Sequence, residues 1–293
     1  MKEFSFFSPG TLDEALTLMN QYKGKASVIA GGTDIVLELN DRSHHPDYIV
    51  DISKIKELRY VKVVDGIVRI GALSTFTDLE NDPYLRDHVK SLYSACYYVG
   101  SPQIRNLGTI GGNVVNASVA GDTPTAFISL DATVVLRSAA GKREMKLTDF
   151  YGGPGKTELE KDELLTEIYF EAPTEQMATA YTKLGKRKAL VIVVIGLAVL
   201  LEKDCNNICS KAQVVIGAVA RYPQRLPLIE HYLVGKPVTK ETFDGCRDLF
   251  SQTVYEMIPT RASVGYKKES VKGVASKTFD SILSDFSLCG VEE

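Results

Sequence analysis

Two glycine-rich turns are the segments of this sequence whose residue types could do chemistry. The first is Ile29-Ala30-Gly31-Gly32-Thr33-Asp34, and the second is Gly108-Thr109-Ile110-Gly111-Gly112-Asn113. Adjacent glycines let bare backbone amides approach a ligand, because no Cβ stands in the way. Successive N–H groups in such a turn form a concave anion-binding site. Two such turns in one domain predict a ligand with two phosphates, and a dinucleotide is the leading candidate.

Either glycine pair alone would more often mark only a tight turn. The combination favours binding, since a hydrogen-bonding residue follows each pair: Thr33 after Gly32 and Asn113 after Gly112. The sequence has neither the G-x-G-x-x-G pattern of a Rossmann dinucleotide site nor the G-x-x-x-x-G-K pattern of a P-loop, so both of these sites are poorly supported.

Other reaction classes find little support in the residues. There is no G-x-S-x-G nucleophile elbow and no H-E-x-x-H metal motif, and the carboxylates are too scattered to single out an acid–base pair. Five cysteines at irregular spacing, without a C-x-x-C pair, predict no zinc site and no iron–sulfur cluster on this chain. We therefore expect no catalytic residue and no bound metal on this chain, and an organic cofactor as the source of reactivity.

Strands and helices must hold the two turns in place. Thr11-Leu12-Asp13-Glu14 has the pattern of a capping box and begins a helix. A strand over 27–30 leads into the first turn, and a helix starts with 35–39. The second turn lies in a stretch, 101–122, that we predict to be a long loop.

The rest of the chain divides near Ala172-Pro173-Thr174, which predicts one domain over 1–174 and a second over 175–293. Asp65-Gly66 predicts a hairpin, and strands followed by helices after the boundary predict an α+β module. The remaining predicted elements are strands at 48–52, 61–64, 67–70, 131–137, 143–147, 163–170, 180–184, 190–201 and 213–219, and helices at 75–79, 85–99, 240–255 and 266–286.

Composition and charge narrow the class of protein further. The 293 residues are 44% hydrophobic and 24% charged, which is typical of a soluble globular protein. A net charge of −3, from 34 basic and 37 acidic side chains, favours neither nucleic acid nor an anionic membrane as a partner. The longest apolar run, 190–201, is shorter than the roughly 20 residues of a membrane span, and the first residues lack an apolar signal region. The sequence thus predicts a cytoplasmic protein.

The two turns and a segment between them resemble a known family. Ala30-Gly31-Gly32-Thr33-Asp34, Gly100-Ser101-Pro102-Gln103-Ile104-Arg105-Asn106 and Gly108-Thr109-Ile110-Gly111-Gly112-Asn113 resemble the FAD-binding medium subunits of molybdenum hydroxylases, such as carbon monoxide, xanthine and nicotinate dehydrogenases. The resemblance covers nearly the whole chain, and nicotinate dehydrogenase FAD subunits look most similar. It implies an α+β fold: a two-subdomain FAD-binding domain of the p-cresol methylhydroxylase (PCMH) or vanillyl-alcohol-oxidase type, then a C-terminal antiparallel sheet plus helices.

The resemblance also implies which residues bind the cofactor. The two turns match the family's two FAD phosphate loops, and in the second loop backbone amides and the asparagine contact the diphosphate. Asp122 matches an aspartate that hydrogen-bonds the cofactor, Leu165 a leucine that packs on the isoalloxazine, and Lys183 a lysine whose charge favours reduced flavin. The residues expected to bind FAD are Val28, Ile29, Ala30, Gly31, Gly32, Thr33, Asp34, Ile35, Thr109, Gly111, Gly112, Asn113, Asp122, Leu165 and Lys183.

Several of these residues have simpler interpretations. Asp122 fits a helix N-cap, Leu165 fits an ordinary core residue, and Lys183 fits a surface lysine on a strand. The basic run Lys186-Arg187-Lys188 fits a solvated charged segment, against the hypothesis that it receives the phosphates of NAD or NADP.

For function, the resemblance implies one subunit of a hetero-oligomer. A molybdopterin-binding large subunit would hydroxylate an N-heterocycle such as nicotinate or a purine, and a two-iron iron–sulfur small subunit would pass electrons to FAD. Reduced FAD would then reduce NAD(P)+ or another acceptor. Two alternatives stay open: an electron-carrying or assembly FAD subunit without an NAD(P) site, and a stand-alone FAD reductase of the same binding fold.

Overall fold

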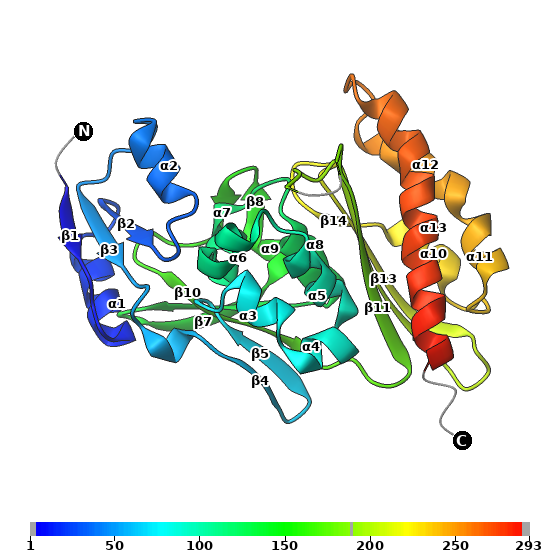
Figure 1. The fold of residues 1–293 in the computed structure, drawn as a ribbon, viewed down its shortest axis with the longest axis horizontal. Coiled ribbons are helices and arrows are strands. Elements are labelled where there is room, and N and C mark those ends of the chain that lie inside the picture. The colour runs from blue at the N-terminus through cyan, green and yellow to red at the C-terminus, as the bar shows by residue number, and fades with distance from the viewer. Residues whose placement is uncertain (1–3, 188–189, 289–293) are drawn as a thin grey trace.

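The computed structural model describes residues 4–187 and 190–288, in which helices and strands are mixed along the chain. Three main sheets follow one another from the N-terminal to the C-terminal end of the molecule (Figure 1). The strands are β1 (Ser5–Phe7), β2 (Ala26–Ile29), β3 (Tyr48–Asp51), β4 (Val61–Val64), β5 (Ile67–Gly71), β6 (Thr133–Ser138), β7 (Gly141–Lys146), β8 (Tyr151–Gly153), β9 (Lys156–Thr157), β10 (Leu164–Glu171), β11 (Met177–Leu184), β12 (Ile195–Lys203), β13 (Cys209–Gly217) and β14 (Gln224–Arg225). The helices are α1 (Leu12–Gln21), α2 (Ile35–Asn40), the 3-10 turn η1 (Lys56–Leu58), α3 (Phe76–Glu80), α4 (Pro83–His88), α5 (Lys90–Tyr97), α6 (Pro102–Leu107), α7 (Ile110–Asn116), α8 (Asp122–Ser129), α9 (Leu147–Phe150), α10 (Pro227–Leu233), α11 (Lys240–Gly245), α12 (Arg247–Met257) and α13 (Val264–Leu288).

The first sheet is small and parallel, with the strand order β1-β3-β2. Helix α1 packs on it through the apolar stripe that the sequence predicts, and Leu16 in that stripe is buried. The predicted capping box forms only in part: Thr11 accepts a hydrogen bond from the amide of Glu14, but the Glu14 carboxylate bonds the amide of Gly10 instead of that of Thr11. Strand β2 ends at Ile29, the first residue of the first glycine turn, and so leads the chain into that turn.

The second sheet is antiparallel, with the order β4-β5-β10-β6-β7. The predicted hairpin is confirmed, since β4 and β5 pair around Asp65 and Gly66. The single helix predicted over 85–99 is instead two helices, α4 and α5. They are separated at Val89, whose dihedral angles of −127° and 58° are not helical.

Most of the stretch 101–122, predicted to be a loop, is helical, whereas residues 117–121 are not. Helix α6 begins after the N-cap Ser101 with proline as its first residue, and α7 begins after the N-cap Thr109. Each N-cap side chain accepts a hydrogen bond from the third amide of its helix, as capping residues do. The second glycine turn is therefore the first turn of helix α7.

The third sheet, β11-β12-β13-β14, is antiparallel and covered on both faces. Alternate residues of β12 point to opposite sides: Ala198 and Leu200 join the core that contains Phe127 of α8, whereas Leu197 and Val199 join the core under α10–α13. The strand predicted from 190 begins only at 195, and the helix predicted over 240–255 is divided into α11 and α12 at Cys246.

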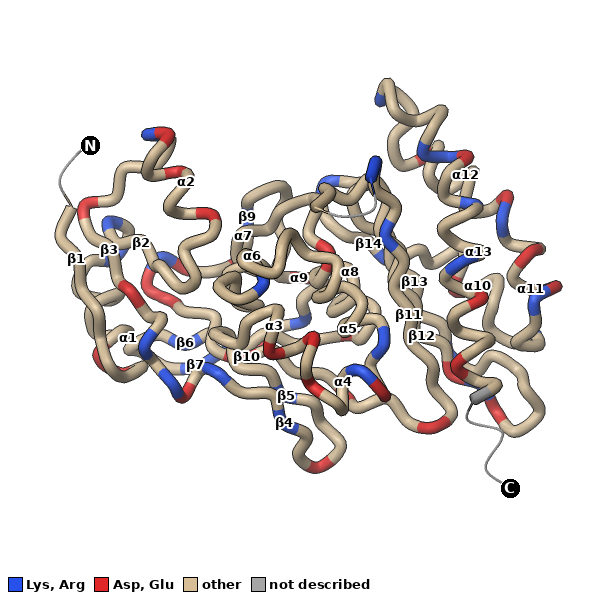
Figure 2. Tube along the Cα trace, viewed as in Figure 1, with Lys and Arg blue, Asp and Glu red and all other residues tan. Residues whose placement is uncertain are grey.

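In the described part of the chain, no helix combines the length and the apolar character that crossing a bilayer requires. Basic and acidic residues are interspersed along this part of the chain (Figure 2). This distribution along the backbone differs from the clustered basic residues by which nucleic-acid-binding domains are identified.

Candidate cofactor-binding site

A cavity of about 980 Å³ lies where the first glycine turn, the helices α6–α8 and the strands β10 and β11 meet. This volume is at the upper end of the range for small-molecule and cofactor sites. All the residues expected to bind a cofactor line the cavity except Ile29, which lies behind the first turn against Gly32. The fold thus brings the two turns together, as the dinucleotide hypothesis requires.

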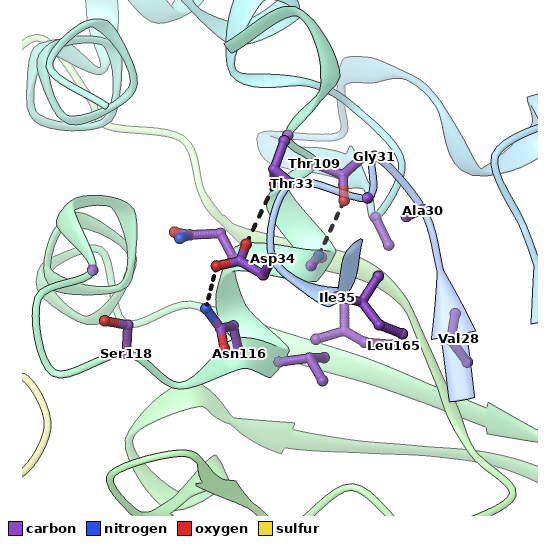
Figure 3. Close-up of a pocket in the computed structure, with 18 of the residues that line it drawn as sticks. Val28, Ala30, Gly31, Thr33, Asp34, Ile35, Thr109, Asn116, Ser118 and Leu165 are labelled. Atoms are coloured by element: carbon purple, nitrogen blue, oxygen red, sulfur yellow. Dashed lines mark hydrogen bonds between the residues drawn. The ribbon is translucent and has the colours of Figure 1, made fainter. Parts of the chain in front are cut away.

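The two turns approach each other so closely that one position accepts only glycine. A Cβ on Gly31 would lie 1.8 Å from the carbonyl oxygen of Leu107, which is the last residue of α6. Side chains join the two segments as well, since Asn116 of α7 donates a hydrogen bond to Asp34 at 3.1 Å (Figure 3). Gly32 has a φ of +72°, in the left-handed region that favours glycine.

The first turn presents free backbone donors. The N–H groups of residues 31–35 make no hydrogen bond to any other part of the described chain. Five successive free donors beside a cavity are an arrangement suited to an anion such as a diphosphate.

The second turn differs from this picture, because its amides are occupied. Ile110 donates to Ser74 at 2.9 Å and Gly111 to Ala72 at 2.8 Å, while the amides of Gly112 and Asn113 bond to Thr109. The sequence prediction of a second amide cradle therefore does not describe this segment. What it offers to a ligand is the side-chain amide of Asn113, a cavity-lining residue whose oxygen accepts a hydrogen bond from Thr123 at 2.6 Å and whose NH₂ group makes none within the described chain.

A buried ion pair lines the cavity where Asp122 of α8 and Lys183 of β11 reach it, and we call this part its polar end. The Lys183 ammonium donates to Asp122 at 2.8 Å and to the Tyr98 carbonyl at 2.9 Å, and the two charged side chains are 5% and 7% exposed. Burial raises the pKa of Asp122, while the charge of Lys183 and hydrogen bonds from Lys183 and Tyr181 act in the opposite direction. Burial also raises the pKa of Tyr181 well above its ordinary value, as does the neighbouring Asp122 charge.

This geometry decides between the alternative interpretations of three residues. Asp122 is the first residue of α8 and not its N-cap, which is Gly121. Lys183 is buried and so is not a surface lysine. Leu165 is both a core residue, at 5% exposure, and part of the cavity wall.

The segment between the two turns, residues 100–106, packs beside the cavity. Arg105 forms an ion pair with Glu80 of α3 at 2.5 Å and donates to the Val99 carbonyl at 3.2 Å. These contacts tie α6, which carries the Leu107 carbonyl, to α3 and to the segment after α5. Ile104 from the same motif lines the cavity, whereas Gln103 does not.

Sequence reasoning did not find several residues that line the cavity. Phe76 is the first residue of α3, and no local signal placed it at a cavity; Ser101, the N-cap of α6, belongs to the family motif but was not expected to line the site. His44 also lines the cavity: it is half-buried, and its Nε2 lies 2.7 Å from the Ser27 hydroxyl. Segment 190–193, assigned to a strand, is an apolar loop at the cavity.

The basic run after β11 is only partly described by the structure. Lys186 and Arg187 are exposed, and the Arg187 guanidinium donates to the Leu190 carbonyl of its own loop at 2.7 Å. Lys188 lies outside the described residues.

Comparison with known proteins gives this site a family. The family described as "FAD binding domain in molybdopterin dehydrogenase" matches residues 2–173, which is more than half of the chain, and the "CO dehydrogenase flavoprotein C-terminal domain" matches residues 180–282. The chain belongs to the FAD-binding medium subunits of molybdenum hydroxylases. Members of this family are oxidoreductase subunits, and so is this chain.

Relatives along the whole chain agree with this membership. The nicotinate dehydrogenase FAD-subunit of Eubacterium barkeri is 50% identical over 97% of each chain. The putative xanthine dehydrogenase FAD-binding subunit XdhB of Escherichia coli is 31% identical over 96% of each. A solved structure of carbon monoxide dehydrogenase from Hydrogenophaga pseudoflava superimposes with a TM-score of 0.88 at 27% identity, covering 97% of this chain and 98% of that chain. The resemblance and the fold class predicted from the motifs are thus confirmed for this FAD-binding subunit.

Proposed function

We propose that this chain is the FAD-carrying electron-transfer subunit of a multi-subunit molybdenum hydroxylase, and that it takes electrons from an iron–sulfur subunit and reduces NAD(P)+ or another acceptor. FAD supplies the ability to take up electrons singly and to release them as a pair. The proposed partners are a molybdopterin-binding large subunit and a two-iron small subunit in a cytoplasmic hetero-oligomer that hydroxylates an N-heterocycle such as nicotinate or a purine. We also propose that the chain divides into two domains, residues 1–174 and residues 175–293.

The observation that carries this proposal is the row of free amides over residues 31–35 at a cavity of dinucleotide size. These amides would hold the diphosphate, together with the Asn113 side chain. The apolar side chain of Leu165 would pack against the isoalloxazine, and the Asp122–Lys183 pair would meet its polar edge. Val28, Ala30, Gly111, Gly112 and Thr109 would line the path between these points, and Ile29 would support the first turn from behind.

The acceptor is the finer part of the proposal. Dinucleotide phosphates need a cationic surface, and Lys186-Arg187-Lys188 is the basic run that lies just beyond Lys183 in the sequence. Arg187→Ala should raise the Michaelis constant for NAD(P)+ while leaving the flavin content unchanged. The existing bond from Arg187 to the Leu190 carbonyl favours the alternative of a subunit without an NAD(P) site, and an unchanged Michaelis constant would support that alternative.

Native purification tests the main proposal. The complex should contain stoichiometric FAD on this chain and should co-purify with two further polypeptides, identified by mass spectrometry of proteins and pigments. Rapid anaerobic mixing with NADH and with NADPH then shows whether either one reduces the flavin. A colourless chain that takes up no FAD would refute the proposal, and substrate turnover by this chain alone would favour the stand-alone reductase.

A further inference from the structure

Three buried side chains form one hydrogen-bonded group at the polar end of the cavity. The Tyr181 hydroxyl donates to one oxygen of Asp122 at 2.5 Å, and the Lys183 ammonium donates to the other oxygen at 2.8 Å. Asp122 and Lys183 line the cavity, whereas Tyr181 lies behind them. We propose that Tyr181 is a positioning residue, which holds the Asp122–Lys183 pair in the arrangement that meets the flavin. This inference rests on the proposed function.

The backbone is built to accommodate the Tyr181 hydroxyl. Tyr181 and Lys183 are two residues apart on β11, so both side chains point to the same face of the sheet, toward α8. Gly196 of β12 is the register partner of Lys183, and a Cβ on Gly196 would lie 2.7 Å from the Tyr181 hydroxyl. A side chain at position 196 would thus press on the Tyr181 hydroxyl, whereas glycine leaves room for it.

The hydrogen bonds fix what Lys183 can offer to a ligand. An ammonium has three donors, and Asp122 and the Tyr98 carbonyl take two of them. The third donor has no partner in the described chain, and Lys183 lines the cavity. With Asp122 ionised the pair has no net charge, so Lys183 acts on the flavin as a hydrogen-bond donor and not as an uncompensated cation.

Tyr181 affects the net charge of the Asp122–Lys183 pair through the protonation of Asp122. Burial favours the protonated carboxyl, and the Tyr181 hydrogen bond opposes that effect. The other groups that act on the site are the Lys183 ammonium and the Cys96 thiol of α5, with Glu80 and Arg105 beyond it. Without the Tyr181 hydroxyl, Asp122 should take up a proton at a higher pH. The uncompensated Lys183 would then stabilise the reduced, anionic flavin.

The test is the flavin midpoint potential of the intact complex, measured from alkaline to acidic pH in Tyr181→Phe. The variant should match the unmodified protein at alkaline pH and become more positive toward acidic pH. A tenfold change in the equilibrium constant of this two-electron couple corresponds to about 30 mV. Asp122→Asn, which leaves Lys183 uncompensated at every pH, should show the positive shift throughout the range. In flavin-free protein, Tyr181→Phe should also weaken FAD binding in a titration.

Tyr60→Phe is the matched control, because the Tyr60 hydroxyl donates to Glu167 at 2.6 Å and neither residue lines the cavity. It should leave the potential and the FAD affinity unchanged. The inference is overturned if Tyr181→Phe keeps the potential of the unmodified protein at all pH values, or if the control shifts equally. If Tyr181→Phe fails to retain flavin, an unshifted potential in Asp122→Asn overturns the inference. If the unmodified complex holds no flavin on this chain, the proposed function itself is refuted.

Discussion

Replacing Gly31 with alanine should force the two turns apart. The new Cβ would lie 1.8 Å from the Leu107 oxygen and 2.5 Å from its carbonyl carbon, and these backbone atoms cannot rotate away. Because ordinary contact begins at 3.4 Å, the segments would have to separate by the difference, about 1.6 Å. Overpacking of this kind destabilises a protein by about 1–3 kcal/mol. The separation would also move the free amides of the first turn away from Asn113, so a ligand that spans both could no longer contact both.

We therefore expect FAD to bind to Gly31→Ala at least tenfold more weakly, which corresponds to about 1.4 kcal/mol. The assay is a fluorescence titration of flavin-free protein with FAD, run beside urea unfolding to show that the variant is folded. Gly273→Ala is the matched control: it lies exposed in α13, where a Cβ meets nothing within 4 Å. That control should gain about 1 kcal/mol of stability from helix propensity and keep its FAD affinity. A folded Gly31→Ala protein with unaltered affinity would refute the reasoning about the two turns.

Three further variants test other parts of the site. Arg105→Met should lower the free energy of unfolding by about 3 kcal/mol in urea, because it strands the largely buried Glu80 carboxylate; an unchanged midpoint would show that this ion pair does not hold α6. Asn113→Asp should weaken FAD binding at least tenfold in calorimetry, since it replaces an NH₂ donor with a negative charge near the diphosphate; equal affinity would exclude a direct contact. The hydrogen bond with Arg143 lowers the pKa of Glu163 in the folded protein. The pair therefore stabilises the fold above the pKa of a glutamate in the unfolded chain, about 4.3. This stabilisation is lost as the pH falls through the pKa of Glu163 in the folded protein. Arg143→Gln should accordingly be less stable at neutral pH and equal to the unmodified protein in acid, and a constant difference across pH would contradict this.

Local patterns predicted the elements whose signals are local. The apolar stripe of α1 and the Asp65-Gly66 hairpin needed no information from distant residues. The helices α6 and α7 were missed because they have only six and seven residues, and the two glycines of α7 disfavour a helix. Helix α7 is stabilised by burial instead, since its residues Ile110 and Val114 are fully enclosed by the core.

At the site, the sequence likewise predicted where segments lie but not what each residue does there. The motifs predicted which segments lie at the cavity, but the availability of each amide depends on partners elsewhere. Gly111 is engaged because the Ala72 carbonyl faces it from the segment after β5, a contact that no local pattern encodes. Lys183 was compatible with a surface position for the same reason, because its counter-charge Asp122 lies 61 residues earlier in the sequence.

The position of the Asp122–Lys183 pair explains why the C-terminal sheet belongs to the site. Every residue of α8 is buried, because this helix packs with Phe127 into a core that includes Leu200 of β12. Asp122 begins α8, and Lys183 comes from the edge strand β11, so the ion pair forms only when the C-terminal sheet is docked. An unpaired buried charge is strongly destabilising, which makes each half of the pair dependent on correct docking. The polar end of the cavity therefore depends on the packing of the C-terminal sheet. A change that loosens the sheet should disturb the Asp122–Lys183 pair before it disturbs the first glycine turn.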